Sequence, residues 1–461
     1  FMEGKKAGYA KNDRVVSDGK VISSTEVSLT ISRAGIPLSV TMTTEMVEIA
    51  AGEPISFTSI QDLGLMKMVV SGKMQPDGRV ALVNSSLGSE QRTVVDWHKG
   101  ALMAEGLSLL QEAKGLKEGT EYSYRVFEPS MAGALDARTV VGTTKQVDLL
   151  GRVVTLTEIT TTISMPGMGE ISSKSYLDDD FKLQKDIMPV MGINIEMVAC
   201  PKEFALGKND VVELIGKMFI ASPVALKNLD SAKSVTYYLD PIEGAKLTIP
   251  PNDNQQVQKS SDGKVIMTVK PVAASVGVTF PYKGDDKAAL EHLKPTQFVQ
   301  SEHKTIVDLA RRAVGGAKDA AEAVERIEAF VADYVEDKNL SVGYASAVEV
   351  AQSKQGDCTE HAVLAAALCR AVGIPAQVVT GLAYVGEWRG VASGFGGHAW
   401  TQAYIGGKWI GLDAAFRGAG RGGYDAGHIA LATGKGDPGD FFSLVTTMGQ
   451  FKIEKATVNR K

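Results

Sequence analysis

The residue pattern changes near position 295, and this change most constrains the fold. Residues 14–95, and again about 120–200, are rich in Val, Ile and Thr with partial alternation of apolar and polar side chains, which is typical of β-strands. Beyond residue 295, apolar side chains recur at helical spacing, as at Val324, Ile327 and Val331, and strand-like segments follow. The pattern predicts a multidomain α+β protein whose last domain contains both helices and strands.

Three parts are predicted along the 461 residues. Residues 1–220 are expected to form a large antiparallel β domain, interrupted by one helix at 101–115. Residues 221–290 are expected to form a small β connector or second β domain, and residues 291–461 an α+β domain. This division agrees with the usual domain size of about 100–200 residues.

Charge and cysteine content exclude several classes of protein. The net charge of -5 and the absence of a basic stripe predict no nucleic-acid partner. No uncharged apolar run reaches about 18 residues, so we expect no transmembrane helix. The three cysteines, Cys200, Cys358 and Cys369, are too few for a disulfide framework. The chain begins without the charged and apolar regions of a signal peptide, so such a peptide is either absent or removed.

The segment GDCTEHAVLAAALCRAVGIP, residues 356–375, predicts a helix with both ends marked. Asp357 is a favourable N-cap, and Glu360 stands three residues later, as in a capping box. Gly373 and the following proline end the helix. Cys358 is therefore the first helical residue, where unpaired amides and the helix dipole favour a thiolate.

The alternative is that a free cysteine serves as a small buried hydrophobe. We interpret Cys369 in this way. It follows Cys358 by eleven residues, about 16 Å along a helix, so the two thiols are too far apart for a disulfide.

A candidate base for the thiol lies in the segment 397–413. Gly406 and Gly407 predict the tip of a hairpin. A loop of two or four residues places Asp413 opposite Trp400 and diagonal to His398, on one face and about 7–8 Å apart. This gives a base with a carboxylate that orients it, whereas a bulge of one residue would turn the two side chains to opposite faces.

These motifs together resemble the core of the transglutaminase-like superfamily, the papain-like cysteine enzymes. The resemblance covers about residues 296–435, and it rests on Gly356-Asp357-Cys358, RAVGIPAQVVTG at 370–381, His398-Ala399-Trp400, and the segment from Trp409 to Asp413. It implies Cys358 as nucleophile, His398 as general base and then acid, and Asp413 as the residue that orients the imidazole.

The resemblance also implies acyl transfer at amide bonds of a peptide or protein, with no cofactor and no metal. Hydrolysis is favoured over cross-linking, because no sequence feature shows how water would be excluded. Related proteins with an N-terminal β region imply a periplasmic or secreted location. The alternative is a non-catalytic binding or assembly protein whose β domain binds a partner or apolar ligand. The partner of that domain is not predicted.

Further candidates surround the three principal residues. Related enzymes add a side-chain donor to the oxyanion hole, for which Gln355 and Gln352 are the candidates. Two glycine-rich loops, 386–397 and 418–423, are expected to flank a substrate groove or to be plain solvated loops. The candidates for lining the groove are His361, Trp388, Trp400 and Tyr424.

Three other motifs have features of ligand sites. GAGRGG at 418–423 matches a dinucleotide fingerprint, but no convincing helix follows it. Cys358, His361, His398 and Asp413 are a possible zinc set, although a Cys-His-Asp relay needs no metal. YLDDDF at 176–181 is interpreted as a solvated turn rather than a calcium loop. His428 is interpreted as a structural residue or one that supports the site.

Overall fold

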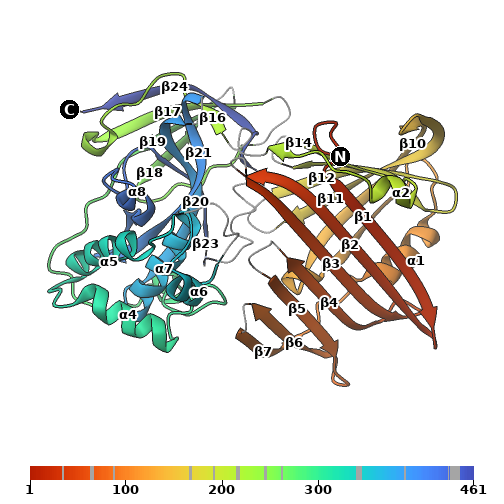
Figure 1. Cartoon of the computed structure of the whole chain (residues 1–461), viewed down its shortest axis with the longest axis horizontal. Coiled ribbons are helices and arrows are strands. Elements are labelled where there is room, and N and C mark those ends of the chain that lie inside the picture. The colour runs from red at the N-terminus through yellow and green to blue at the C-terminus, as the bar shows by residue number, and fades with distance from the viewer. Residues whose placement is uncertain are drawn as a thin grey trace. The chain divides into compact units, whose positions relative to one another are not determined.

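The computed structural model divides the chain into two compact units, Phe1–Leu214 and Ile215–Lys461. The first is called unit 1 and the second unit 2. The structure describes residues 1–33, 36–62, 67–86, 89–165, 169–190, 193–213, 219–242, 247–260, 263–338, 345–388, 391–434, 436 and 447–460. Figure 1 shows both units, with many of their elements labelled.

Unit 1 contains two sheets of mainly antiparallel strands. The first has the order β1-β2-β3-β4-β5-β6-β7, with the short β15 pairing in parallel with β2. Its strands are β1 (Gly8–Ser17), β2 (Lys20–Arg33), β3 (Ile36–Ile49), β4 (Pro54–Asp62), β5 (Lys67–Met74), β6 (Arg79–Ser86), β7 (Ser89–Asp96) and β15 (Val212–Glu213). Each hairpin follows the sequence, as at Asp18-Gly19, where both residues adopt positive φ between β1 and β2.

The second sheet of unit 1 has the order β14-β13-β12-β11-β10-β9-β8. Its strands are β8 (Ala101–Leu102), β9 (Glu121–Glu128), β10 (Gly133–Leu149), β11 (Arg152–Met165), β12 (Gly169–Leu177), β13 (Leu183–Val190) and β14 (Ile193–Val198). Helix α1 (Ala104–Lys114) confirms the helix predicted at 101–115, and α2 (Lys202–Ala205) follows the sheet. A buried cluster that includes Phe57, Val80 and Phe127 joins the two sheets.

Unit 2 also contains two sheets. One has the order β16-β21-β20-β23, with β22 pairing with β21, and the other has the order β18-β19-β17-β24. The strands are β16 (Phe219–Ala221), β17 (Ser234–Pro241), β18 (Gln255–Lys259), β19 (Val265–Val269), β20 (Ala376–Trp388), β21 (Val391–Ile405), β22 (Lys408–Leu412), β23 (His428–Gly434) and β24 (Phe451–Asn459).

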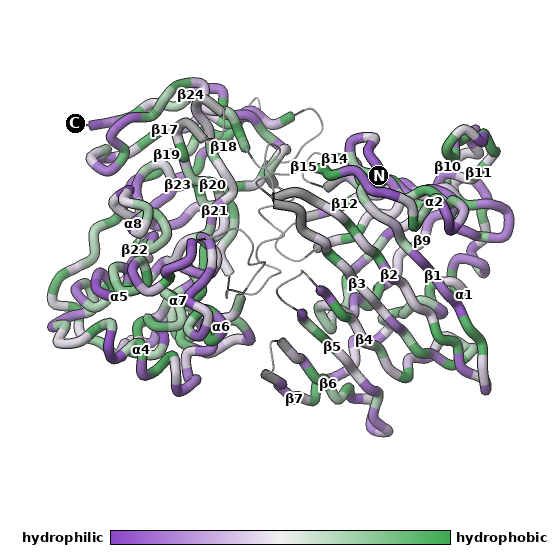
Figure 2. The backbone as a smooth tube through the Cα atoms, in the orientation of Figure 1, coloured by the Kyte–Doolittle hydropathy of each residue, from purple (hydrophilic) through white to green (hydrophobic). Residues whose placement is uncertain are grey.

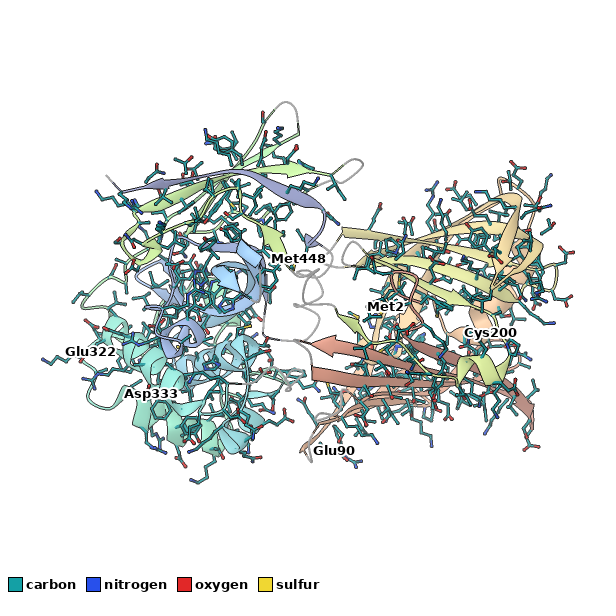
Figure 3. All side chains as sticks on the ribbon, turned by 45° about the horizontal axis from the view of Figure 1, so that its top comes forward. Met2, Glu90, Cys200, Glu322, Asp333 and Met448 are labelled. Atoms are coloured by element: carbon teal, nitrogen blue, oxygen red, sulfur yellow. The ribbon has the colours of Figure 1, made fainter. Side chains whose placement is uncertain are left out.

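The α-helices in the described residues of unit 2 are α3 (Lys287–Glu291), α4 (Lys304–Val314), α5 (Ala320–Tyr334), α6 (Ala347–Ser353), α7 (Cys358–Ala371) and α8 (Ala414–Gly418). Apolar and polar residues alternate along α4 and α5 in Figure 2, as expected for helices with one buried face. The stripe of Val324, Ile327 and Val331 is buried, whereas Glu322 and Asp333, labelled in Figure 3, lie on the outer side of α5.

The fold class predicted from the sequence is confirmed: the chain is a multidomain α+β protein built mostly from antiparallel sheets. The segment 221–290, assigned above to a connector, supplies β17, β18 and β19 of unit 2, and β24 from the far end of the chain completes their sheet. A buried cluster that includes Tyr237, Met267, Leu382 and Phe395 packs this sheet on β20 and β21.

The interpretation of residues 386–397 as a loop is wrong for most of the segment. Residues up to Trp388 belong to β20, and residues from Val391 onward belong to β21, while 389–390 lie outside the described residues. A glycine fits closely here: a Cβ on Gly396 would lie 3.3 Å from the Phe219 ring, a tight contact that would need a small shift of that ring. None of the helices in the described ranges is long and apolar enough to cross a membrane.

Candidate active site

The first turn of α7 is fixed by the capping box that the sequence predicts. The Asp357 side chain accepts from the Thr359 amide at 2.9 Å, and Glu360 accepts from the Asp357 amide at 2.8 Å. Glu360 is fully buried and also accepts from the amide of Ala345 at 2.9 Å. Cys358 is half-buried at the first position of this helix, where helix amides favour a thiolate.

Gly356 is required by the same turn. Its φ is +153°, and a Cβ placed on it would lie 2.2 Å from Cβ of Glu360. The Gly-Asp-Cys sequence is thus explained physically: glycine makes room for Glu360, aspartate caps the helix, and cysteine occupies the first position.

The hairpin of β21 and β22 brings His398 and Asp413 together. Ile405 pairs with Lys408 and Thr401 with Leu412, so the two-residue Gly406-Gly407 loop gives the predicted register. Nε2 of His398 lies 2.7 Å from Oδ2 of Asp413. His398 is 7% exposed and Asp413 1%, so water contributes little screening to this pair.

Both carboxylate oxygens and the backbone amide of Asp413 are hydrogen-bonded. Its Oδ1 accepts from the Phe416 amide at 2.9 Å and so caps α8. Its own amide donates to Oε1 of Glu328 on α5 at 2.6 Å, and Glu328 is in turn paired with Arg417 at 3.0 Å. The carboxylate therefore has one orientation, with Oδ2 directed at the imidazole.

A second histidine shares the same carboxylate oxygen. Nε2 of His428 lies 2.9 Å from Oδ2 of Asp413, and its Nδ1 lies 3.1 Å from Oδ1 of Asp425. His428 is fully buried, and Asp425 is 7% exposed. The four side chains form a continuous buried series, His398, Asp413, His428 and Asp425.

Asp413 and His428 shift each other's pKa. Burial alone would raise the pKa of Asp413, but the charges and hydrogen bonds of the two histidines outweigh burial and hold that pKa well below its usual range. Burial alone would lower the pKa of His428, but hydrogen bonds to Asp413 and Asp425 outweigh it and raise this pKa to about 9. The two carboxylates therefore favour the imidazolium form of His428 at neutral pH.

This raised pKa predicts a loss of stability on the alkaline side. Because His428 titrates near 6.5 when unfolded, its stabilisation is complete below that pH and disappears as the pH rises to about 9. We expect the free energy of unfolding to fall by about 3 kcal/mol over this interval. Urea unfolding from pH 6 to 9.5 measures the effect, and His428→Gln should abolish it. An equal pH dependence in wild type and variant would contradict this prediction.

The N-terminal turn of α7 lies beside the elements that carry the His398–Asp413 pair. Helix α7 packs against both β21 and α8. Oγ1 of Thr401 on β21 donates to the Ala362 carbonyl at 2.9 Å, one helical turn after Cys358. Burial lowers the pKa of His361, three residues after Cys358, and the charge of Asp413 acts on it in the opposite direction. The charge of the Asp413 carboxylate thus acts on a side chain in the first turn of α7.

The remaining candidate residues occupy different environments. Gln352 is exposed and Gln355 half-buried. His361 and Trp400 are 2% and 1% exposed, so they pack beneath the site and present little surface to a groove. Tyr424 is half-buried and lies against the rings of Trp400 and His428. The side chain of Trp388 lies outside the described residues.

Among the described residues, His398, Asp413 and His428 are also a group close enough to share a metal ion, with ligand atoms within 4.8 Å of one another. This group differs from the possible zinc set considered from the sequence: it includes His428 and lacks Cys358 and His361. The nitrogen–oxygen separations of 2.7 and 2.9 Å are ordinary hydrogen-bond lengths. The geometry fits proton-sharing partners better than ligands held around an ion.

Comparison with known proteins identifies the class of unit 2. Residues 307–414 match the model of the Transglutaminase-like superfamily, so the chain contains a transglutaminase-like domain. The match includes Cys358, His398 and Asp413 and ends before Asp425 and His428.

Solved structures show distant similarity. A "Putative Cysteine Protease" from Cytophaga hutchinsonii is 20% identical with a TM-score of 0.34, and the match covers 50% of this chain and 83% of that one. A β-barrel-like protein from Brucella abortus is 13% identical with a TM-score of 0.32, covering 41% and 85%. The periplasmic domain of TgpA from Pseudomonas aeruginosa, bound to ethylmercury, is 16% identical with a TM-score of 0.29, covering 40% and 73%. The curated proteins gave no match.

Two residues that sequence reasoning did not connect to Asp413 are Glu328 and Asp425. Glu328 lies 85 residues before Asp413, on a helix whose spacing marks only its buried face. Asp425 and His428 are three residues apart, a spacing that places a carboxylate beside an imidazole across a tight turn. This three-residue spacing is the sequence signal for the contact between Asp425 and His428. It does not specify that His428 also contacts Asp413.

Proposed function

We propose that this protein is a cysteine-dependent acyl-transfer enzyme that acts on amide bonds of a peptide or protein. The buried 2.7 Å pair of His398 and Asp413, beside the capped first turn that carries Cys358, supports this proposal most directly. The transglutaminase-like match of residues 307–414 supports the same chemistry.

In the proposed reaction the thiolate of Cys358 attacks the amide carbonyl carbon. The carbon–nitrogen bond breaks, the leaving amine takes its proton from His398, and an acyl-enzyme forms. Water then gives its proton to His398 and attacks the thioester, which releases the acid and the thiolate. Asp413 keeps the imidazole oriented through Nε2, so that Nδ1 is the nitrogen that exchanges protons.

We favour hydrolysis over transfer to a lysine amine, and therefore a protease or amidase over a cross-linking enzyme. A glutamine-containing peptide library with and without a labelled primary amine separates the two outcomes. Incorporation of the label in excess of free acid would contradict the hydrolytic assignment. The periplasmic or secreted location stays a prediction of the resemblance.

The test of the proposed relay is the rate of Cys358 alkylation by iodoacetamide from pH 4 to 9. We expect the Cys358 thiolate to form well below the ordinary pKa of about 8.5. In His398→Ala we expect the rate of alkylation at pH 6 to fall by about tenfold or more. His98→Ala, a histidine of unit 1, is the matched control. Peptide mass mapping separates Cys358 from Cys200, which lies in unit 1 (Figure 3). Burial raises the pKa of the Cys369 thiol to about 12, which leaves it unreactive.

An ordinary titration near 8.5 that is the same in wild type and His398→Ala would overturn the enzymatic proposal. The binding or assembly function, with unit 1 as the recognition part, would then be the better interpretation.

A further inference from the structure

We propose that His428, held in place by Asp425, is a positioning residue of the relay that places a fixed positive charge behind Asp413. The inference rests on the proposed function, and it extends the three-residue relay to four side chains. It concerns residues beyond the matched stretch 307–414.

The contacts give each nitrogen of His428 a carboxylate. Nε2 meets Oδ2 of Asp413 at 2.9 Å, and Nδ1 meets Oδ1 of Asp425 at 3.1 Å and the Asp425 carbonyl oxygen at 3.0 Å. An imidazolium donates from both nitrogens, so the charged form satisfies both contacts. The neutral form has a weaker alternative, in which Nδ1 accepts from the Asp425 amide at 3.2 Å.

Asp425 is itself fixed by the turn that precedes β23. Its Oδ1 accepts from the Gly427 amide at 2.7 Å, and the intervening Ala426 carbonyl accepts from the hydroxyl of Tyr237 at 2.8 Å. The turn is therefore hydrogen-bonded to β17 as well as continuous with β23, and these contacts hold the Asp425 side chain in one orientation against His428.

The charged and titratable groups around His428 come from several elements. The nearest are the Asp413 and Asp425 carboxylates, the His398 ring at 5.7 Å between centroids and the Tyr424 ring at 4.6 Å. Behind Asp413, Glu328 is paired with Arg417. Arg421 stacks over Phe416, whose ring lies 5.0 Å from that of His428. The two carboxylates in direct contact therefore dominate, and they favour the imidazolium.

This arrangement changes how strongly Asp413 retains a proton on His398. A lone carboxylate would stabilise the His398 imidazolium and slow its loss of the proton to the leaving amine. The His428 imidazolium contacts the same oxygen, Oδ2 of Asp413, and its positive charge offsets part of the attraction between Asp413 and His398. His398 therefore releases its proton more readily. Removal of the charge on His428 should therefore strengthen the attraction between Asp413 and the His398 imidazolium.

Ring-nitrogen-15 spectra of the six histidines test the charge directly. In wild type we expect one imidazole to stay doubly protonated until about pH 9. Its signal should disappear in His428→Gln, whereas His98→Gln should remove a different signal. If every histidine loses its charge near the ordinary value of about 6.5, the inference is overturned.

The alkylation profile of Cys358 tests the relay role. When a thiolate is paired with an imidazolium, the alkylation rate changes with pH in two steps. The lower step is the formation of the pair, and the upper step is the loss of the imidazolium proton. In His428→Gln, which keeps a donor at Nε2, and in Asp425→Asn, we expect the upper step to rise by about one pH unit or more. A merely structural role would lower reactivity at every pH and leave both steps in place.

The outcomes separate this inference from the proposed function. An activated Cys358 whose upper step is unchanged in both variants contradicts the role of His428 alone. A wild-type Cys358 that is inert contradicts the proposed function and the relay role together, and the histidine spectra then still report whether His428 carries a charge.

Discussion

Asp413→Asn is expected to slow alkylation of Cys358 at pH 6 by about 100-fold, because no orientation of the amide satisfies the site. If the NH₂ group replaces Oδ2, it faces the N–H groups of His398 and His428. If it replaces Oδ1, it faces the Phe416 amide, which donates to that position at 2.9 Å. Loss of the thiolate-favouring imidazolium returns the thiol towards its ordinary titration near 8.5, which at pH 6 is a large fall in thiolate.

The matched control for this variant is Asp319→Asn. Asp319 caps α5 through the Glu322 amide at 2.9 Å, as Asp413 caps α8, but it lies outside the relay. It should change stability by no more than about 1 kcal/mol, because asparagine caps a helix about as well as aspartate, and it should leave alkylation of Cys358 unchanged. A similar loss of alkylation in both variants would mean that capping, rather than the relay, accounts for the effect, and Asp413 would lose its assigned role.

Gly356→Ala is expected to destabilise unit 2 by about 3 kcal/mol. The new Cβ would lie 2.2 Å from Cβ and 2.4 Å from Cγ of Glu360, and the backbone at φ +153° disfavours any L side chain. Glu360 cannot move away cheaply, because it is fully buried and accepts from two amides. Thermal and urea unfolding measure the change.

Gly316→Ala provides the comparison for that experiment. It lies between α4 and α5, its φ is outside the left-handed region, and a Cβ there would meet nothing within 4 Å. We expect a change within about 0.5 kcal/mol. If Gly356→Ala is equally harmless, the close contact with Glu360 does not determine the turn.

The sequence was most informative where local chemistry decides the structure. Helix α7 begins at Cys358 because Asp357 and Glu360 cap it, and both residues carry this signal in the sequence itself. The hairpin register followed from Gly406-Gly407, because a two-residue loop fixes which positions pair. These two local predictions were enough to place His398 and Asp413 on the same face of the hairpin, diagonal to each other.

The contacts that depend on tertiary packing were not predictable. Glu328 reaches the Asp413 amide from a helix 85 residues earlier. His428 approaches from β23, whose pairing with β20 contains an irregularity between Thr380 and Gly381, so parity along the strand gives no guide.

Glycine-rich composition suggested a loop at 386–397, whereas residues 386–388 belong to β20 and 391–397 to β21. Glycines occur in this sheet because its neighbours approach closely. A Cβ on Gly381 would lie 2.0 Å from the Ile429 carbonyl oxygen.

The pairing of β17 with β24 has a consequence for biosynthesis. Ser234 pairs with Asn459 and Pro241 with Phe451, so the sheet that supports the Asp425 turn through Tyr237 joins segments more than 200 residues apart. Phe451, the first residue of β24, follows Asp413 by 38 residues (451 − 413), so a ribosome makes β24 after the other strands of this sheet. We expect nascent chains that lack β24 to have an incomplete sheet beneath the Asp425 turn. Unit 2 would then reach its described fold only after β24 has been synthesised.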